Sequence, residues 1–206
     1  MPNAYIGFYW TLPVNWAGFR RLPTTVDAAA AKSRTIRYQR ELARRYVAAD
    51  RGTLLDEIAF IDVQPDRPTD MIRAELLAKV AKHAGRATLL YVRFEEIHLW
   101  RRNRFLPETA QDLGLKILPL PPDPTLIDGE LFDPILHFKQ WRKRDEGART
   151  LLKLEAGQEL RLALAEIPEG NGRWQAIAER LNGAGTRTSS GGSWTAENVR
   201  KHTSRL

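Results

Sequence analysis

The chain has 206 residues and a formal net charge of +7, with 43% hydrophobic residues and no cysteine. This composition supports a buried core and excludes a disordered tail, disulfide scaffolds, thiolate zinc sites and cysteine nucleophiles. The basic excess favours a polyanionic partner, most often nucleic acid.

Four short apolar runs have the length and composition of β-strands. They cover residues 4–10, 58–63, 88–92 and 116–120. Each run is nearly continuous, which is typical of parallel strands that are covered on both faces. Helical patterns lie between them, over residues 26–49, 70–83 and 108–113. The order β-α-β-α-β-α-β therefore predicts an α/β fold with a parallel sheet.

The first predicted helix carries four arginines on the side away from its apolar residues. They are Arg34, Arg37, Arg44 and Arg45. Because a helix that packs on a sheet turns its polar side to water, we expect a solvated face here, with a DNA or partner surface as the alternative.

The composition changes after residue 120, where a proline-rich loop begins. Asp133 has the position of a helix cap, and Pro134 suits the first position of the helix. An apolar stripe at Leu131, Ile135, Phe138 and Trp141 suits either an intramolecular core or a dimer interface. The helical pattern continues to residue 167, so we expect one long helix, continuous or briefly broken, that leaves the α/β domain.

The last 36 residues are expected to form a separate unit. Apolar residues recur at helical spacing from Trp174 to Leu181, a turn rich in Gly and Ser follows, and Thr195 has the position of a cap. Two short helices joined by such a turn predict a helix-turn-helix. From residue 171 onward there are six basic and two acidic residues, a net charge of +4. More than half of the net charge of the chain therefore lies in this unit.

These C-terminal residues resemble the DNA-binding region of the serine recombinases, the family of resolvases, invertases and large serine integrases. The similar segments are residues 174–182, 185–188, 192–195 and 198–200. The resemblance implies a resolvase-like α/β domain over residues 1–125, a long connecting and dimerisation helix over 126–167 and a helix-turn-helix domain over 168–206. It also implies a homodimer that binds double-stranded DNA.

The N-terminal part is similar to the family more weakly. Asp66-Arg67-Pro68 matches an element after the second strand, and the resemblance implies that Arg67 contacts the scissile phosphate. Residues 115–120 resemble the fourth strand of the family, and residues 125–131 precede the long helix much as they do there.

The positions that carry catalysis in the family differ in this chain. Trp10 falls where the family has an arginine, and Leu12, or Thr11 one place earlier, falls where it has the nucleophilic serine. Glu96 and Leu99 replace two further arginines. Phosphoryl transfer needs cations around the developing negative charge and an activated hydroxyl. We therefore expect a catalytically inactive member of the family, a pseudoenzyme.

DNA binding is expected at the long helix and at the C-terminal unit, because Arg and Lys hold phosphates while Asn and Arg read base edges. The candidate residues are Arg142, Lys143, Arg144, Arg187, Thr195, Asn198, Arg200, Lys201 and Arg205. The expected role is a site-binding regulator or accessory factor of recombination or transcription, with an active recombinase or the transcription machinery as a further partner.

Two enzyme readings remain as alternatives. One is an active recombinase with a displaced active site, in which Thr11 is the nucleophile and Arg93, Arg101 or Arg102 supplies the missing charge. The other is a metal-dependent nuclease. Its metal would lie on the carboxylates that follow two predicted strands, Asp62, Asp66, Glu95 and Glu96.

No metal or cofactor is expected, because the carboxylates lack a motif of fixed spacing and the four histidines are scattered. The longest apolar runs are far shorter than the roughly 18 residues of a membrane span. The N-terminus lacks the pattern of a signal peptide. We therefore expect no membrane partner, and a cytoplasmic protein of a bacterium, a phage or another mobile genetic element, associated with the nucleoid.

Overall fold

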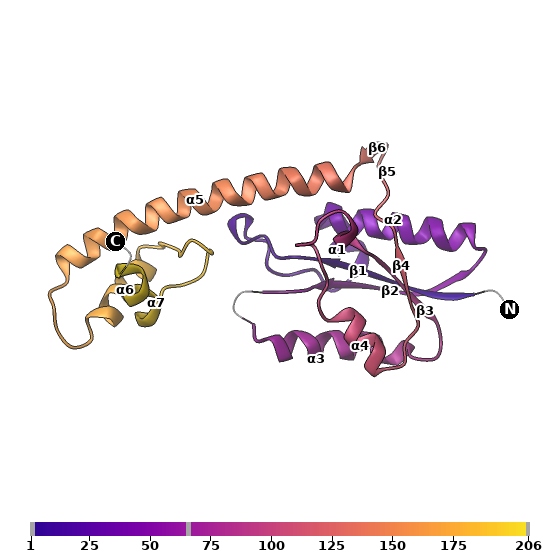
Figure 1. Cartoon of the computed structure of the whole chain (residues 1–206), viewed down its shortest axis with the longest axis horizontal. Coiled ribbons are helices and arrows are strands. Elements are labelled where there is room, and N and C mark those ends of the chain that lie inside the picture. The colour runs from indigo at the N-terminus through magenta and orange to yellow at the C-terminus, as the bar shows by residue number, and fades with distance from the viewer. Residues whose placement is uncertain (1–2, 65–66, 205–206) are drawn as a thin grey trace. The chain divides into compact units, whose positions relative to one another are not determined.

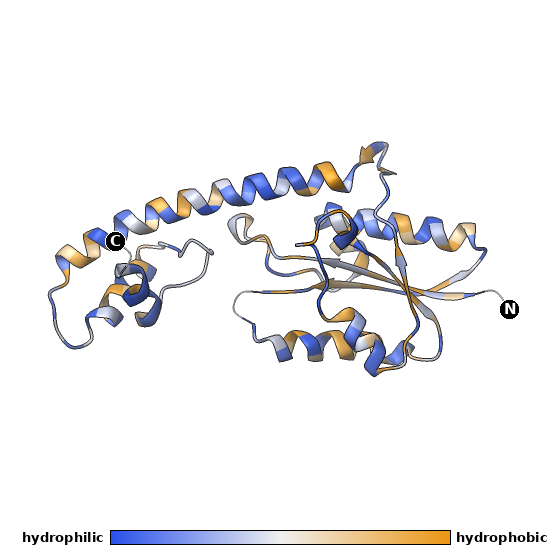
Figure 2. Ribbon diagram, viewed as in Figure 1, coloured by the Kyte–Doolittle hydropathy of each residue, from blue (hydrophilic) through white to orange (hydrophobic). Residues whose placement is uncertain are grey.

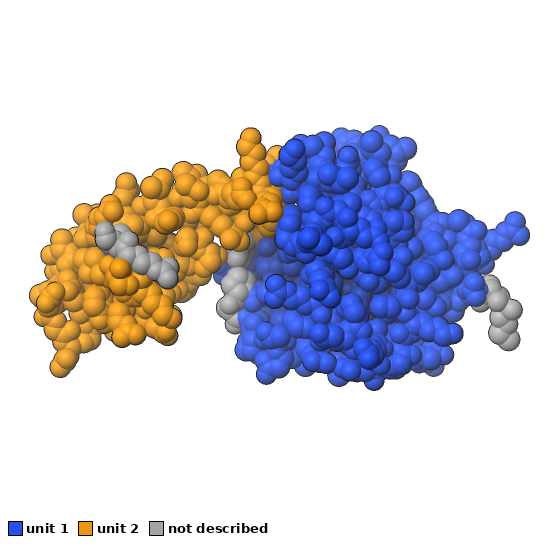
Figure 3. Space-filling view, viewed as in Figure 1, with its two compact units in different colours: residues 1–13, 19–140 blue, residues 14–18, 141–206 orange. Residues whose placement is uncertain are grey.

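The computed structural model describes residues 3–64 and 67–204. The chain forms two compact units, which Figure 3 distinguishes by colour. Unit 1 comprises residues 1–13 and 19–140, and unit 2 comprises residues 14–18 and 141–206. These boundaries differ from the expected segments 1–125, 126–167 and 168–206. The first turns of the long helix belong to unit 1 because Phe138 is buried in its core.

Unit 1 is built on a four-stranded parallel sheet with the strand order β2-β1-β3-β4. The strands are β1 (Ala4–Thr11), β2 (Thr53–Ile61), β3 (Thr88–Val92) and β4 (Ile117–Leu120). Helices α1 (Val26–Lys32) and α2 (Arg34–Ala49) cover one face, and α3 (Thr69–Val80) and α4 (Leu106–Asp112) cover the other (Figure 1). The predicted α/β fold with a parallel sheet is confirmed.

Two elements differ most from their predictions. β2 begins at Thr53 rather than at residue 58, because an edge strand alternates between exposed and covered residues before its buried end. The helix predicted over residues 26–49 is two helices that meet at Ser33. The Ser33 N–H donates to the Ala29 carbonyl at the end of α1, and its side chain accepts from the Ile36 N–H at the start of α2. One buried serine thus caps both helices.

A short hairpin follows the sheet and was not predicted. β5 (Thr125–Ile127) and β6 (Glu130–Phe132) pair antiparallel through a two-residue turn. Asp128 and Gly129 both have positive φ angles, 52° and 80°, as a tight hairpin turn requires. The Asp-Gly pair was the sequence signal for this hairpin. Three 3-10 turns complete the elements, at Asn15–Ala17, Ala81–His83 and Phe94–Glu96.

The long helix α5 (Pro134–Glu166) is unbroken, and its predicted cap is confirmed. The Asp133 Oδ1 accepts from the backbone N–H groups of Ile135 and Leu136. Figure 2 shows mostly hydrophilic residues along the middle of α5. Within the described parts of the chain, no helix combines the length and the apolar character needed to cross a bilayer.

Unit 2 packs the later turns of α5 against two short helices, α6 (Arg173–Gly183) and α7 (Ala196–Thr203). Its buried core comprises Ala156, Leu160, Ala163, Ile177, Ala178, Leu181, Trp194 and Val199. The segment that joins α6 to α7, residues 184–195, is longer than the three or four residues of a simple helix-turn-helix turn.

Candidate functional site

The carboxyl edge of a parallel sheet is the usual place for a ligand site in an α/β fold. An open α/β sheet binds ligands where its strand order reverses, and in unit 1 that point lies between β1 and β3. β1 pairs with β3 only as far as Phe8 and Tyr91, whereas it pairs with β2 as far as Thr11 and Ile61. The two central strands therefore separate beyond Phe8.

Protein side chains fill the space where these strands separate. Gln39 of α2 donates from Nε2 to the Trp10 carbonyl at 2.7 Å and accepts at Oε1 from the Trp10 N–H at 3.1 Å. The Trp10 indole N–H donates to the Val92 carbonyl at 3.3 Å. Gln39 and Trp10 are both fully buried. The crevice that other α/β sheets leave for a ligand is thus occupied by this pair.

The residues that the resemblance places at altered catalytic positions lie in the core of unit 1 or at its surface. Trp10 is a core residue, and Leu12 is partly buried against the same core. Thr11 is buried, and its hydroxyl lies 3.4 Å from the Leu12 carbonyl. Leu99 is 87% exposed.

The charged residues of the expected catalytic region bind near neighbours. Arg67 is ion-paired with Glu75 of α3, and Glu96 is ion-paired with Arg93. Among the residues that the structure describes, no hydrogen bond or ion pair joins Arg67 or Glu96 to Thr11. Asp66 lies outside the described residues.

Asp62, directly after β2, is the most unusual acidic residue of unit 1. It is 1% exposed, and neither carboxylate oxygen has a hydrogen-bond partner in the described part of the chain. Burial raises the pKa of Asp62 to about 6, against the opposing charges of Arg104 and Arg101. Buried carboxylates with a raised pKa are common at functional sites. Among the described residues, no group of three or more His, Asp or Glu side chains could hold a metal ion, either around Asp62 or elsewhere.

Arg101 is the second unusual group, and the sequence indicated it only as one of three arginines that could supply the charge of a displaced active site. It is 2% exposed, and its Nε and one Nη have no partner among the described residues. Its guanidinium lies over the rings of Phe138, Trp10, Trp100 and Phe94, with distances to the ring centroids of 4.3, 5.2, 5.6 and 5.7 Å. Burial lowers the pKa of Arg101 to about 9, and the charge of Asp62 opposes this shift.

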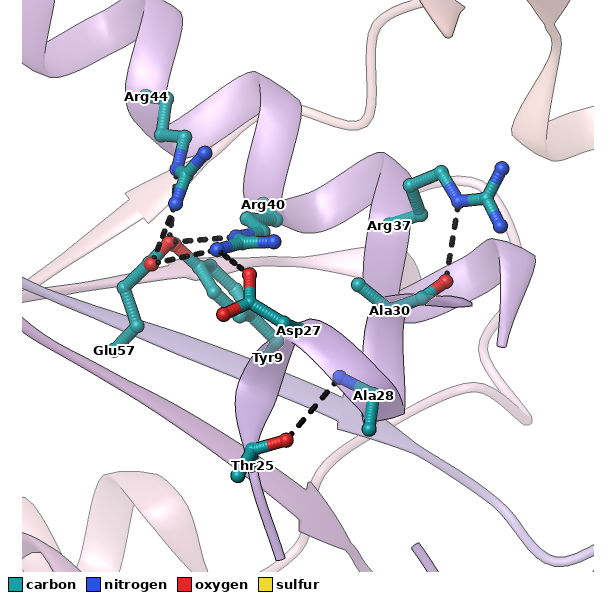
Figure 4. A network of polar contacts seen from close by, with 9 residues as sticks. All are labelled: Tyr9, Thr25, Asp27, Ala28, Ala30, Arg37, Arg40, Arg44 and Glu57. Carbon is teal, nitrogen blue, oxygen red and sulfur yellow. Dashed lines mark hydrogen bonds and ion pairs between the residues drawn. The ribbon is translucent and has the colours of Figure 1, made fainter. Parts of the chain in front are cut away.

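A cluster of paired polar side chains joins α2 to β2 (Figure 4). Glu57 accepts from Arg40 and Arg44, with contacts of 2.7–3.2 Å, and from the Tyr9 hydroxyl at 2.8 Å. Burial would raise the pKa of Glu57, but the bonds from Arg44, Arg40 and Tyr9 together hold it below its usual value. Every member of this cluster is paired, so the cluster fixes the helix on the sheet.

The arginines expected to form a solvated face on α2 instead bond to other elements. Arg34 pairs with Glu130, Arg37 pairs with Asp128, and Arg45 donates to the Leu126 carbonyl, all in the hairpin of β5 and β6. Arg44 binds Glu57 of β2. These four side chains stay partly exposed. The sequence did not predict, however, that they bind the hairpin and the edge of the sheet. Sequence patterns do not indicate these bonds, because the bonded residues are far apart in the chain.

In unit 2, the predicted cap of the last helix is confirmed. The Thr195 side chain accepts from the Asn198 N–H, and the Asn198 Oδ1 accepts from the Thr195 N–H at 2.8 Å. Asn198 Nδ2 donates to the Ser193 carbonyl at 3.4 Å. The amide of Asn198, a candidate for base reading, is therefore engaged within its own turn.

Two arginines of α6 and the predicted DNA-binding residues of unit 2 form two separate groups. Arg173 donates to the carbonyls of Leu164 and Ile167, and Arg180 pairs with Glu159 and Glu166, so both hold α6 to α5 and the turn that follows it. The second group is exposed. It contains Arg142, Lys143, Arg144, Arg187, Arg200 and Lys201.

Three members of the exposed group have polar partners. Lys201 pairs with Glu197 at 2.6 Å, Arg142 pairs with Glu146 at 3.0 Å, and Arg187 donates to the Ser193 hydroxyl at 3.0 Å. Such exposed pairs are weak and exchange readily for a stronger anion. Arg205 lies outside the described residues.

Comparisons of the chain with family models, with curated proteins and with solved structures found no match.

Proposed function

We propose that this protein binds double-stranded DNA through unit 2, as a serine-recombinase-like factor that does not itself cut or rejoin DNA. The observation that carries the proposal is the setting of Arg200 and Lys201 on α7. Both side chains are exposed. Val199, which precedes them in the same helix, is fully buried in the core of unit 2. A helix fixed in this way presents cations to phosphates with little further loss of conformational freedom.

The distribution of paired charges also supports unit 2 as the binding surface. Ion pairs with the sheet edge and the hairpin engage the arginines at positions 34, 37, 40 and 44. On α5, by contrast, Lys143 and Arg144 are exposed beside the exposed pair of Arg142 and Glu146. A polyanion gains most from cations whose release from existing partners costs little.

The test is the affinity of the intact protein for duplex DNA, measured by fluorescence anisotropy at several salt concentrations. Arg200→Ala and Lys201→Ala should each weaken binding by about tenfold and reduce the salt slope by about 1. Arg86→Ala and Lys116→Ala, at exposed sites of unit 1, are the matched controls and should change neither quantity. Equal affinities for all four variants would refute the proposed surface.

The absence of cleavage is supported by the Trp10–Gln39 pair, which fills the crevice at the carboxyl edge, and by the engagement of Arg67 and Glu96 elsewhere. Incubation with bound DNA followed by detergent should give no covalent adduct. An adduct that Thr11→Ala abolishes would instead establish an active recombinase. Cleavage that depends on Mg²⁺ and leaves no adduct would establish a nuclease.

The proposal includes a homodimer. Leu151, Leu154 and Leu162 of α5 are 69%, 61% and 51% exposed, and helical spacing places them away from the buried Ala156 and Leu160. Sedimentation of the intact protein should give a dimer that Leu151→Glu dissociates. Within this proposal the dimer regulates or assists recombination or transcription at nucleoid DNA in the cytoplasm.

A further inference from the structure

Unit 2 contains a small pocket between α5, the segment before α7 and α7 itself. Its volume is about 180 Å³. Its apolar lining comes from Ala156, Leu160 and the ring of Trp194, and its polar lining from Lys153, Ser189 and His202. A cavity of roughly 150 Å³ holds one benzene molecule, so this pocket suits a ligand with a body of that size.

The pocket has room for a ligand because one of the four residues of α5 that line it is a glycine. Gly157 lines the pocket in the interior of the helix, where glycine is less favourable than alanine by about 1 kcal/mol. A Cβ added at Gly157 would meet no atom within 4 Å other than those of its own helix and chain neighbours. No close approach of a neighbour therefore requires glycine here, and its missing side chain contributes only space.

The polar lining contains one cation, Lys153, and no carboxylate. Lys153 is exposed and makes no ion pair with a described residue. Trp194 is 3% exposed, and its indole N–H has no acceptor in the described part of the chain. Because that nitrogen is closed to solvent, the indole contributes its ring to the wall of the pocket. The ring of His202 lies edge-on to the indole, with 5.1 Å between the ring centroids.

We propose that this pocket binds a small monocarboxylate whose apolar body is about the size of a benzene ring. The ammonium of Lys153 compensates the charge of the carboxylate, and the ring of Trp194 packs against the apolar body. The walls of Ala156 and Leu160 cover the body. A single lysine balances one negative charge. A dianion such as phosphate would enter the pocket with its second charge unpaired, and the cost of removing water from that charge would oppose binding. The site does not depend on the proposed binding of DNA.

Benzoate is the probe, titrated into the intact protein labelled with ¹⁵N. The indole N–H signal of Trp194, assigned with Trp194→Phe, should shift as the pocket fills, because the ring of benzoate then lies against the indole. Calorimetry on Lys153→Met should show an affinity for benzoate lowered about tenfold, as expected for the loss of one charge-assisted hydrogen bond.

The decisive variant is Gly157→Leu, which puts a side chain into the pocket from a position where a Cβ meets no neighbouring atom. It should abolish benzoate binding and leave the melting temperature unchanged or higher, since leucine favours the helix. Gly147→Leu is the matched control. Gly147 lies in the same helix, has equally free space for a Cβ and does not line the pocket, so this variant should bind benzoate like the original protein.

Three results would overturn the proposal. The first is a benzoate affinity that survives Gly157→Leu. The second is binding of benzylammonium or inorganic phosphate as tight as that of benzoate, which would remove the selectivity for a monocarboxylate. The third is a Trp194 indole signal that stays in place at saturating benzoate.

Discussion

The side-chain amide of Gln39 bonds to both backbone groups of Trp10, its Nε2 to the carbonyl and its Oε1 to the N–H. These two groups point toward β3, which has ceased to pair with β1 at this level. Gln39 thus stands where a neighbouring strand would otherwise bond. Its Nε2 also donates to the Thr35 carbonyl one turn earlier, which fixes the amide in place.

Replacement of Gln39 by leucine should therefore destabilise unit 1. It leaves the N–H and the carbonyl of Trp10 buried without partners, at a cost of about 1–3 kcal/mol for each group. We expect the free energy of unfolding, measured in urea, to fall by about 3 kcal/mol. Gln111→Leu, at an exposed position of α4, is the control and should stay within about 0.5 kcal/mol. A Gln39→Leu protein as stable as the control would show that these bonds add nothing.

Asp62 should make stability depend on pH between about 4 and 6. Burial raises its pKa from 3.8 to about 6, so the folded state binds more protons than the unfolded state in this window. The free energy of unfolding should fall as the pH rises through it, by about 3 kcal/mol, and the loss should persist at higher pH.

The test for Asp62 is urea unfolding of the original protein and of Asp62→Asn from pH 4 to 7. The variant should gain stability relative to the original protein as the pH rises. Asp70→Asn, at an exposed residue of α3, should show no such gain. A constant difference between Asp62→Asn and the original protein would contradict the raised pKa.

Arg101 should tolerate methionine better than lysine. Its planar guanidinium lies over four aromatic rings, whereas a compact ammonium holds its water more strongly and stacks less well. We expect Arg101→Lys to lower the free energy of unfolding by about 2 kcal/mol or more. Arg101→Met should stay within about 1 kcal/mol, because an apolar chain of similar length replaces a buried charge. Arg102→Lys, at the exposed neighbour, should have no effect, and equal losses for the two lysine variants would refute this account.

Glu57 should stabilise unit 1 most at neutral pH. Its pKa is lowered in the folded state, so its contribution is present above the unfolded value of about 4.5 and is lost as the pH falls below it. Glu57→Gln should cost about 2–3 kcal/mol at pH 7 and less at pH 3. Glu130→Gln is the matched control, because Glu130 pairs with Arg34 at 2.8 Å but is 75% exposed. It should cost at most about 0.5 kcal/mol, and a cost equal to that of Glu57→Gln would mean that burial does not matter.

The sequence predicted the elements that depend on local signals. Apolar runs located all four strands of the sheet, and Asp133 with Pro134 located the start of α5. The double cap at Ser33 was hidden because the helical pattern continues on both sides of it. Asp62 and Arg101 could not be recognised as unpartnered groups, since burial and partners depend on residues far away in the chain. The pocket at Gly157 was missed for the same reason.

The parallel order of the sheet also has a consequence for the kinetics of folding. Ala4 pairs with Thr53 and Ile6 pairs with Leu89, so no strand of this sheet can form with its neighbour through a local turn. Long-range pairing of this kind slows folding, whereas the helices of unit 2 meet over shorter separations. During synthesis β1 emerges first and waits longest for its partners, with an apolar surface open to aggregation. In stopped-flow refolding, burial of Trp10 should lag behind burial of Trp194, and simultaneous phases would contradict this order.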